Sequence, residues 1–176
     1  MLTNRKIGNL YCFWFNKEGR PALCIGPHWQ FFACFCSFIV LIGCFFVFSV
    51  GPSVSAGLTA VTCLVFGTLI LNYSLAALLN PGIAMFEGNK VDCKEVEDSR
   101  TYCSECEVYM DPYTEHCDDC GVCIVSYDHH CPWTSKCIGM GNLCFFNGFL
   151  VSLIVCFVFS VISLGLQARA KRISHH

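Results

Sequence analysis

The chain has 176 residues, which allows one compact domain or a few membrane spans with one folded loop, and excludes a large multidomain enzyme. Hydrophobic residues make up 55% and charged residues 14% of it, whereas soluble domains average about 45–50% and about 25%. This composition argues against intrinsic disorder. The formal net charge of −2 offers no broad cationic surface, so we expect no nucleic-acid partner.

The first predicted membrane span is the uncharged run of residues 31–50. Twenty apolar residues are enough to cross a hydrocarbon core of about 30 Å as a helix. The run is too long for the apolar region of a signal peptide, which has about 7–15 residues. Segment 1–30, which precedes it, carries four basic residues: Arg5, Lys6, Lys17 and Arg20. They predict a cytosolic N-terminal segment under the positive-inside rule.

Two further apolar runs complete the predicted membrane part. Residues 57–79 follow a Gly-Pro-Ser turn and form a hairpin with the first span, so the hairpin covers 31–79. Residues 143–166 form the third predicted span, and a basic tail, 167–176, follows it. We therefore expect an α-helical integral membrane protein with three transmembrane helices and a cytosolic domain, residues 80–142, between the second and the third.

The basic tail conflicts with this topology. Three spans place Arg169, Lys171 and Arg172 on the far side of the membrane, which the positive-inside rule disfavours. Either the charges of the loops dominate, or the third run does not fully cross, or a fourth span is missing from this chain. The sequence leaves these explanations open.

Cysteines are abundant and unevenly distributed, with 16 in the chain. Six lie inside apolar runs, where a free thiol behaves as a small hydrophobe. Seven others crowd into one polar stretch together with three histidines. These ten residues are Cys103, Cys106, His116, Cys117, Cys120, Cys123, His129, His130, Cys131 and Cys137. Metal binding or catalysis explains that stretch better than disulfides do.

The spacing of these residues favours zinc. Cysteine pairs two residues apart, such as Cys103/Cys106 and Cys117/Cys120, can bind one tetrahedral zinc from a tight turn. Two closed zinc sites use eight ligands, so two of the ten groups are left over. If one His and one nearby Cys stay unligated, a base and a nucleophile lie side by side after a carboxylate, that of Asp128. A purely structural zinc module is the alternative that the count leaves open.

The block from Cys103 to Phe146 resembles the cysteine-rich domain of the DHHC-type protein S-acyltransferases, the palmitoyltransferases. The matching motifs are Asp128-His129-His130-Cys131, Pro132-Trp133, Cys137-Ile138-Gly139, Asn142 and Phe145-Phe146. Beyond this block, Asn80-Pro81-Gly82 resembles the Asp-Pro-Gly motif of that family, and Gly26-Pro27 also fits. The family normally has four spans and a Thr-Thr-x-Glu motif after the fourth, and this chain shows neither.

The resemblance implies which residues bind metal. It assigns one structural zinc to Cys103, Cys106, His116 and Cys123, and a second to Cys117, Cys120, His130 and Cys137. It leaves Asp128, His129 and Cys131 as the catalytic set. Cys131 would be the nucleophile, His129 its base, and Asp128 the carboxylate that orients the imidazole.

The implied activity is protein S-acyl transfer. A long-chain acyl group passes from palmitoyl-CoA to Cys131 as a thioester and then to a cysteine thiol of a protein. The expected partners are membrane lipid, acyl-CoA and cytosolic or membrane proteins with accessible cysteines. The expected location is the endomembrane system (ER or Golgi) or the plasma membrane. The alternative is a truncated, catalytically incomplete membrane adaptor with a structural zinc module. By position, Cys12 and Cys24 are further candidates for acylation.

Overall fold

The computed structural model describes residues 5–85 and 101–174. The chain folds as two units. One comprises residues 1–32 and 76–144 and holds the cysteine-rich region, and the other comprises residues 33–75 and 145–176 and is helical. We describe each unit by itself.

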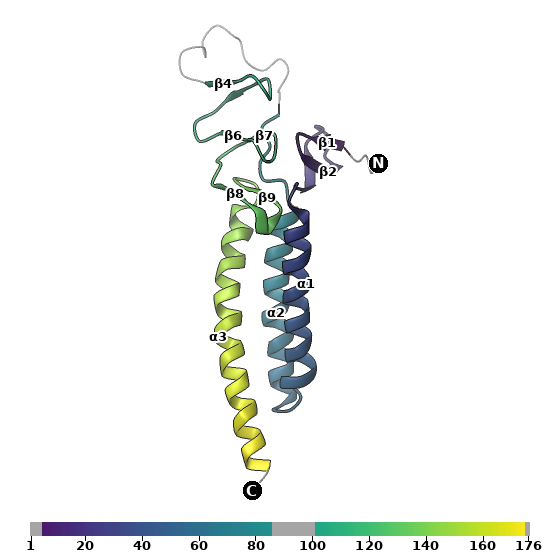
Figure 1. The fold of residues 1–176 in the computed structure, drawn as a ribbon, viewed down its shortest axis with the longest axis vertical. Coiled ribbons are helices and arrows are strands. Elements are labelled where there is room, and N and C mark those ends of the chain that lie inside the picture. Colours follow the sequence, from purple (N-terminus) through teal and green to yellow (C-terminus); the bar gives the residue numbers. More distant parts are fainter. Residues whose placement is uncertain (1–4, 86–100, 175–176) are drawn as a thin grey trace. The chain divides into compact units, whose positions relative to one another are not determined.

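The helical unit consists of three long helices (Figure 1). They are α1 (Trp29–Phe45), continued by a π-helical turn (Phe46–Val50), α2 (Ala56–Leu78) and α3 (Leu143–Ser174). All three helices found in the described residues are long and apolar enough to cross a membrane, as the sequence predicted. Helix α3 continues past the predicted third span into the basic tail, because good helix formers and no proline follow Gly165.

Aromatic packing connects the three helices. The rings of Phe35 in α1 and Tyr73 in α2 have centroids 5.3 Å apart, and Tyr73 lies 4.9 Å from Phe149 in α3. Tyr73 is fully buried. Since lipid is as apolar as these side chains, close packing rather than the hydrophobic effect must hold such helices together.

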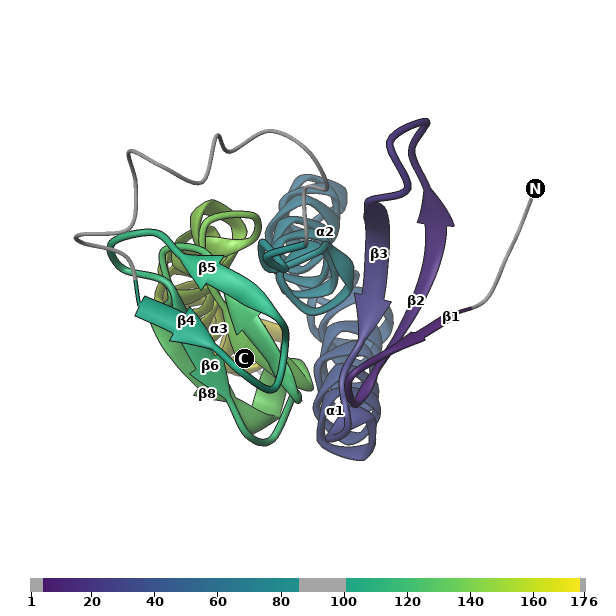
Figure 2. The same ribbon diagram turned by 90° about the horizontal axis from the view of Figure 1, so that it is seen from above.

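The cysteine-rich unit begins with a three-stranded antiparallel sheet, seen at the right of Figure 2. Its strands are β1 (Arg5–Ile7), β2 (Leu10–Phe15) and β3 (Pro21–Ile25). Side chains alternate between the two faces of a strand, so β2 buries Leu10 and Cys12 while Tyr11 is exposed. The sequence predicts only a cytosolic segment for residues 1–30, and this sheet was not expected.

Three short hairpins make up the rest of this unit. They pair β4 (Thr101–Cys103) with β5 (Val108–Met110), β6 (Glu115–Cys117) with β7 (Val122–Ile124), and β8 (His129–Cys131) with β9 (Lys136–Ile138). A 3-10 turn, Pro132–Thr134, connects β8 to β9. The core between them is small and consists largely of cysteines, so this unit needs another source of stability.

The predicted Asn80-Pro81-Gly82 motif forms the exit from α2. Oδ1 of Asn80 accepts hydrogen bonds from the backbone N–H groups of Gly82 (2.9 Å) and Ile83 (3.0 Å), and its Nδ2 donates to the carbonyl of Pro21 (2.8 Å). Gly82 has a φ of +105°, a conformation that favours glycine. The motif therefore turns the chain from α2 into the cysteine-rich unit.

Two buried side chains hold the end of α2. Nζ of Lys136 donates to the carbonyls of Ala76 and Ala77, and Nδ2 of Asn142 donates to that of Ala76 at 2.8 Å. Both side chains are 0% exposed. Burial lowers the pKa of Lys136 to about 8. These contacts satisfy carbonyls that the last turn of a helix leaves without intrahelical partners.

Candidate metal centres and nucleophile hairpin

The β6–β7 hairpin explains why the two predicted ligand sets interleave along the chain. His116 and Cys117 are consecutive in β6, so their side chains point to opposite faces. His116 pairs across the hairpin with Cys123, whereas Cys117 pairs with Val122. One face thus supplies two ligands to the first group, and the other face supplies Cys117 to the second.

The first group of ligand atoms is compact. Nδ1 of His116 lies 3.5, 3.2 and 3.7 Å from the Sγ atoms of Cys103, Cys106 and Cys123. All four ligand atoms lie within 4.8 Å of one another. These are the four residues that the resemblance assigns to one zinc.

The second group has the same chemistry. Nδ1 of His130 lies 3.4 Å from Sγ of Cys117, 3.4 Å from Sγ of Cys120 and 3.5 Å from Sγ of Cys137. His130 and Cys137 are directly opposite each other in the β8–β9 hairpin. Again the four ligand atoms lie within 4.8 Å of one another.

Both groups fit a tetrahedral zinc ion. With Zn–S near 2.3 Å and Zn–N near 2.0–2.1 Å, neighbouring ligand atoms in such a site lie about 3.5–3.8 Å apart. The measured N···S separations cluster around these values. A donor set of three thiols and one imidazole is typical of structural zinc. Each group would use all four ligands and leave no open position for a substrate.

The pKa values of the clustered thiols diverge. The pKa of Cys120 is lowered to about 5, first because its sulfur accepts a hydrogen bond from the thiol of Cys137, whose own pKa is raised by that bond. The pKa of Cys103 is lowered to about 7, first because the backbone N–H of Cys106 donates to it. Burial raises the pKa of Cys123. Metal binding must displace the protons of those thiols whose pKa is raised. The affinity for metal will therefore fall as the pH falls.

The β8 strand separates the two adjacent histidines. His130 points to the second metal group, so alternation places His129 and Cys131 on the opposite face of the strand. Nδ1 of His129 lies 2.6 Å from Oδ1 of Asp128. Asp128 and His129 are partly exposed, at 49% and 39%, and Cys131 is 7% exposed. Asp128, His129 and Cys131 belong to neither of the two thiol-rich metal groups.

A tight turn follows Cys131 and fixes its backbone. The hydroxyl of Thr134 donates to the carbonyl of Cys131 at 3.2 Å, and the N–H of Ser135 donates to that of Pro132 at 2.9 Å. Ser135 has a φ of +75°. The side chain of Trp133 remains 57% exposed beside Phe31, with ring centroids 5.7 Å apart.

One sequence expectation is wrong. Cys12 and Cys24, named as candidates for acylation, are both 0% exposed and face each other across β2 and β3, with their sulfur atoms 2.8 Å apart. They pack in one core with the second group's Cys117, Cys120 and Cys137. Their alternation in the sheet buries them, so an acyl donor cannot reach them in this fold.

The structure also adds site neighbours that the sequence did not single out. His28 contacts His130, and Glu105 lies beside His116. Glu105 is close in sequence to the ligands, whereas His28 is 102 residues from its partner. Its only signal in the sequence is its place directly after Gly26-Pro27.

Part of the chain is similar to known proteins. Residues 96–175 match the family model described as DHHC palmitoyltransferase. The chain is 34% identical over 112 residues to palmitoyltransferase ZDHHC8 of Drosophila melanogaster, which is 56% of this chain and 12% of that protein. It is 31% identical over 139 residues to human palmitoyltransferase ZDHHC8, which is 69% of this chain and 18% of that protein.

A shorter match has higher identity. Palmitoyltransferase ZDHHC18-B of Danio rerio is 39% identical over 72 residues, 40% of this chain and 19% of that protein. In each case the chain spans less than a fifth of the length of the curated relative. Residues 96–175 are therefore similar to the domain of the DHHC palmitoyltransferase family.

Proposed function

We propose that this protein is a protein-cysteine S-acyltransferase that moves a long-chain acyl group, palmitoyl, from acyl-CoA to protein thiols. The observation that carries the proposal is that the candidate metal ligands of the cysteine-rich unit are separate from three other reactive residues. Two groups collect eight Cys and His ligands, and Asp128, His129 and Cys131 stay outside both. The carboxylate and imidazole are already paired, as in other nucleophile–His–Asp sets.

The reaction we propose has two steps, acylation of Cys131 and transfer of the acyl group to a protein thiol. In the first, Nε2 of His129 accepts the thiol proton of Cys131 as its sulfur attacks the acyl carbonyl carbon. The thioester bond to CoA breaks, and the leaving thiolate takes the proton. In the second, a protein thiol loses its proton to His129 and attacks the acyl group on Cys131, which is released as the thiol. Asp128 holds Nδ1–H of His129, so that Nε2 carries the lone pair.

The two zinc ions would have a structural role. When bound, each ion supplies a rigid four-way crosslink to a unit whose apolar core is small. The first would be held by Cys103, Cys106, His116 and Cys123, and the second by Cys117, Cys120, His130 and Cys137. The His130 ligand lies between His129 and Cys131 in β8, so fixing it also fixes the backbone of both reacting residues.

The helical unit would accommodate the acyl tail. It contains a cavity of about 390 Å³, lined by Phe35, Ile39 and Phe46 of α1 and its π-turn and by Leu153 and Phe157 of α3, among others. Each methylene buried there stabilises the bound chain by about 0.8 kcal/mol. Acyl length would therefore be selected by the depth of an apolar cavity.

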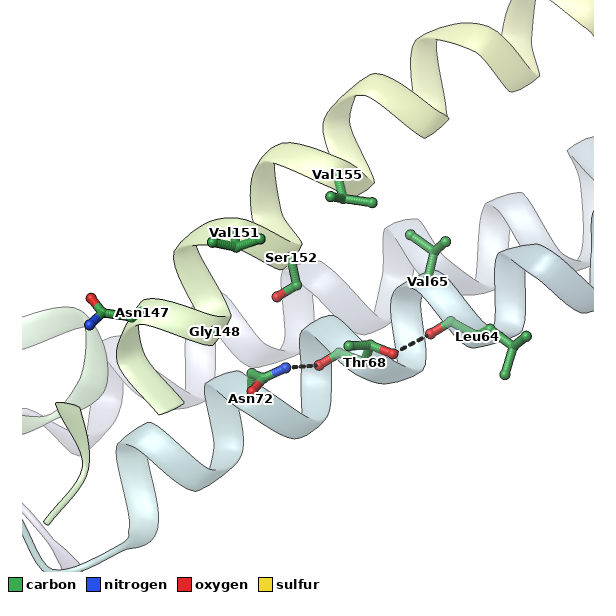
Figure 3. Close-up of a pocket in the computed structure, with 9 residues that line it drawn as sticks. All are labelled: Leu64, Val65, Thr68, Asn72, Asn147, Gly148, Val151, Ser152 and Val155. Atoms are coloured by element: carbon green, nitrogen blue, oxygen red, sulfur yellow. Dashed lines mark hydrogen bonds between the residues drawn. The ribbon is translucent and has the colours of Figure 1, made fainter. Parts of the chain in front are cut away.

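A second cavity, of about 570 Å³, has a different lining (Figure 3). It lies between α2 and α3, where Thr68 and Asn72 face Ser152 among valine and leucine side chains. Its hydroxyl and amide groups make it the poorer place for a saturated tail. We therefore assign the tail to the more apolar cavity.

We further propose that residues 80–142 face the cytosol of an endomembrane or plasma-membrane compartment. Acyl-CoA and reduced protein thiols are both available on that side, and zinc-binding thiols persist there. Protease protection in sealed vesicles tests this orientation. Protection of this domain from protease added outside right-side-out ER vesicles would contradict it.

The decisive experiment is transfer of labelled palmitate from palmitoyl-CoA to the purified full chain in detergent. We expect a hydroxylamine-labile label on the wild type and on Cys144→Ala, whose exposed thiol lies outside both metal groups. The label should be absent from Cys131→Ala, with unchanged zinc content. A folded, zinc-loaded wild type without label would refute the enzyme and favour the adaptor.

A further inference from the structure

The two metal-binding histidines have different partners behind them. Nε2 of His116 lies 3.0 Å from a carboxylate oxygen of Glu105, a side chain that is 72% exposed. Nε2 of His130 instead lies 3.0 Å from Nδ1 of His28, in a part-buried contact. A carboxylate oxygen of Asp119 lies 4.0 Å from the same Nε2 atom. The second group thus relies on an imidazole from a distant segment.

With zinc bound in the second group, this contact would set the proton positions of both rings. Nδ1 of His130 faces three thiols at 3.4–3.5 Å, so its lone pair must point at the metal position. Its proton therefore sits on Nε2 and is donated to Nδ1 of His28. The two rings meet at an interplanar angle of 74°, which is compatible with such a bond. His28 then carries its own proton on Nε2.

We propose that His28 is a positioning residue of the second zinc site: by accepting the Nε2 proton of His130, it fixes the tautomer and orientation of that ligand. Hydrogen-bond partners of this kind hold metal-binding imidazoles in place, and losing one typically costs about 10–100-fold in metal affinity. The inference rests on the proposed zinc binding and is independent of catalysis.

Hydrogen bonds and a close backbone contact hold the chain around His28 in place. The N–H of Gly26 donates to the hydroxyl of Ser135 at 3.1 Å, and the N–H of His28 donates to the carbonyl of Ser135 at 3.3 Å. A Cβ on Gly26 would lie 2.0 Å from that carbonyl oxygen. The segment therefore docks at close range on the turn that follows Cys131. Its position depends on the hairpin that carries both His130 and the nucleophile.

The coupling predicts a site-specific effect. Without His28, the ring of His130 can rotate, and zinc should leave the second group faster while the first group is unaffected. The appropriate variants are His28→Leu, which removes the acceptor, and His28→Asn, whose Oδ1 occupies nearly the position of Nδ1. Glu105→Gln is the matched change beside His116, and it should have little effect because Glu105 is largely exposed.

The experiment counts zinc in the purified full chain, adds excess chelator, and traps released thiols with N-ethylmaleimide for mapping by mass spectrometry. In His28→Leu we expect labelling of Cys117, Cys120 and Cys137 to accelerate at least tenfold. Labelling of Cys103, Cys106 and Cys123 should keep its wild-type rate. His28→Asn should restore the wild-type rate in the second group.

The controls separate the two proposals. Fewer than two zinc ions in the wild type would refute the proposed zinc binding itself. Two ions with equal release from wild type and His28→Leu would overturn only the role of His28. Equal acceleration in both groups, or failure of His28→Asn to rescue, would show that His28 acts by general packing and would also overturn it.

Discussion

Oδ1 of Asp128 lies 2.6 Å from Nδ1 of His129, although neighbouring residues in an extended chain generally point apart. Asp128 precedes β8, and its N–H donates to the carbonyl of Ile138 at 3.0 Å. The carboxylate therefore reaches the ring of His129 from outside the strand. This relationship distinguishes His129 from His130, whose Nδ1 faces the thiols of the second Cys/His group.

The pair predicts the effect of Asp128→Asn. An amide can donate to Nδ1 and so stabilise the wrong tautomer of His129, which removes the lone pair from Nε2. We expect the rate of Cys131 acylation to fall on the order of 10²–10⁴-fold. The measurement is single-turnover label uptake at saturating palmitoyl-CoA.

The control for that measurement is Glu18→Gln, the same chemical change at an exposed turn. It should leave the acylation rate unchanged, and zinc content should stay at the wild-type level in both variants. A rate for Asp128→Asn within a few-fold of wild type would show that the carboxylate does not orient the base.

The two Cys-x2-Cys turns have different residues directly after the second cysteine. Gly121 follows Cys120 with a φ of +64°, whereas Glu107 follows Cys106 with a φ of +54°. A side chain in this left-handed region costs about 1–2 kcal/mol. Glu107→Gly should therefore raise the free energy of unfolding by up to about 1 kcal/mol, because the flexibility that glycine adds to the unfolded chain offsets part of the gain. Gly121→Ala should lower it.

Thermal unfolding of the zinc-loaded chain, followed by protection of its cysteines from alkylation, checks both variants. For Gly121→Ala the cost should be conformational, since a Cβ there would lie 3.4 Å from backbone atoms of Gly8 and Asn9, which is ordinary van der Waals contact. If Glu107→Gly lowers the midpoint temperature of cysteine exposure, the left-handed conformation of Glu107 does not limit the stability of this site.

The three helices and the zinc-type spacing could be predicted from the sequence, because long uncharged runs and repeated Cys-x2-Cys pairs are strong local signals. The sequence alone could not show which eight of the ten Cys and His residues form the two ligand sets. Counting left two groups over, and only the resemblance chose His130 rather than His129. The structure adds a physical reason, which is the alternation of side chains along β6 and β8.

The N-terminal sheet was missed for a related reason. Strand β2 reads Leu-Tyr-Cys-Phe-Trp-Phe, which shows no polar alternation by which a strand can be recognised. His28 was missed because its partner is 102 residues away. Contacts of this range depend on the fold and leave no pattern in a single sequence. The catalytic roles of Asp128, His129 and Cys131 stay a prediction.

Gly26 provides a separate test of how the N-terminal segment docks. A methyl group there would overlap the carbonyl of Ser135, which must shift or release the segment. We expect Gly26→Ala to lower the unfolding free energy by about 2 kcal/mol or more, as overpacking against backbone does. Hydrogen exchange should show faster exchange at residues 21–28 and at the turn after Cys131.

The matched change is Gly19→Ala. Gly19 lies in the turn between β2 and β3 with a φ of +76°, but a Cβ there would meet nothing within 4 Å. This variant should cost only the conformational strain, about 1–2 kcal/mol, and exchange at the turn after Cys131 should be unchanged. Equal exchange at that turn in the two variants would mean that Gly26 is not a docking contact.

Metal removal should affect more of the chain than its ligands. The buried Leu10, Cys12 and Cys24 of the N-terminal sheet pack in one core with Cys117, Cys120 and Cys137. Chelation removes the crosslink that orders those three ligands, so the N-terminal sheet should lose its packing partner. We expect hydrogen-exchange protection to collapse in β6–β9 and also in β2 and β3, whereas α1, α2 and α3 remain protected in detergent. If chelation unfolds the hairpins and leaves β2 and β3 protected, the sheet is stable by itself and does not depend on the second zinc site.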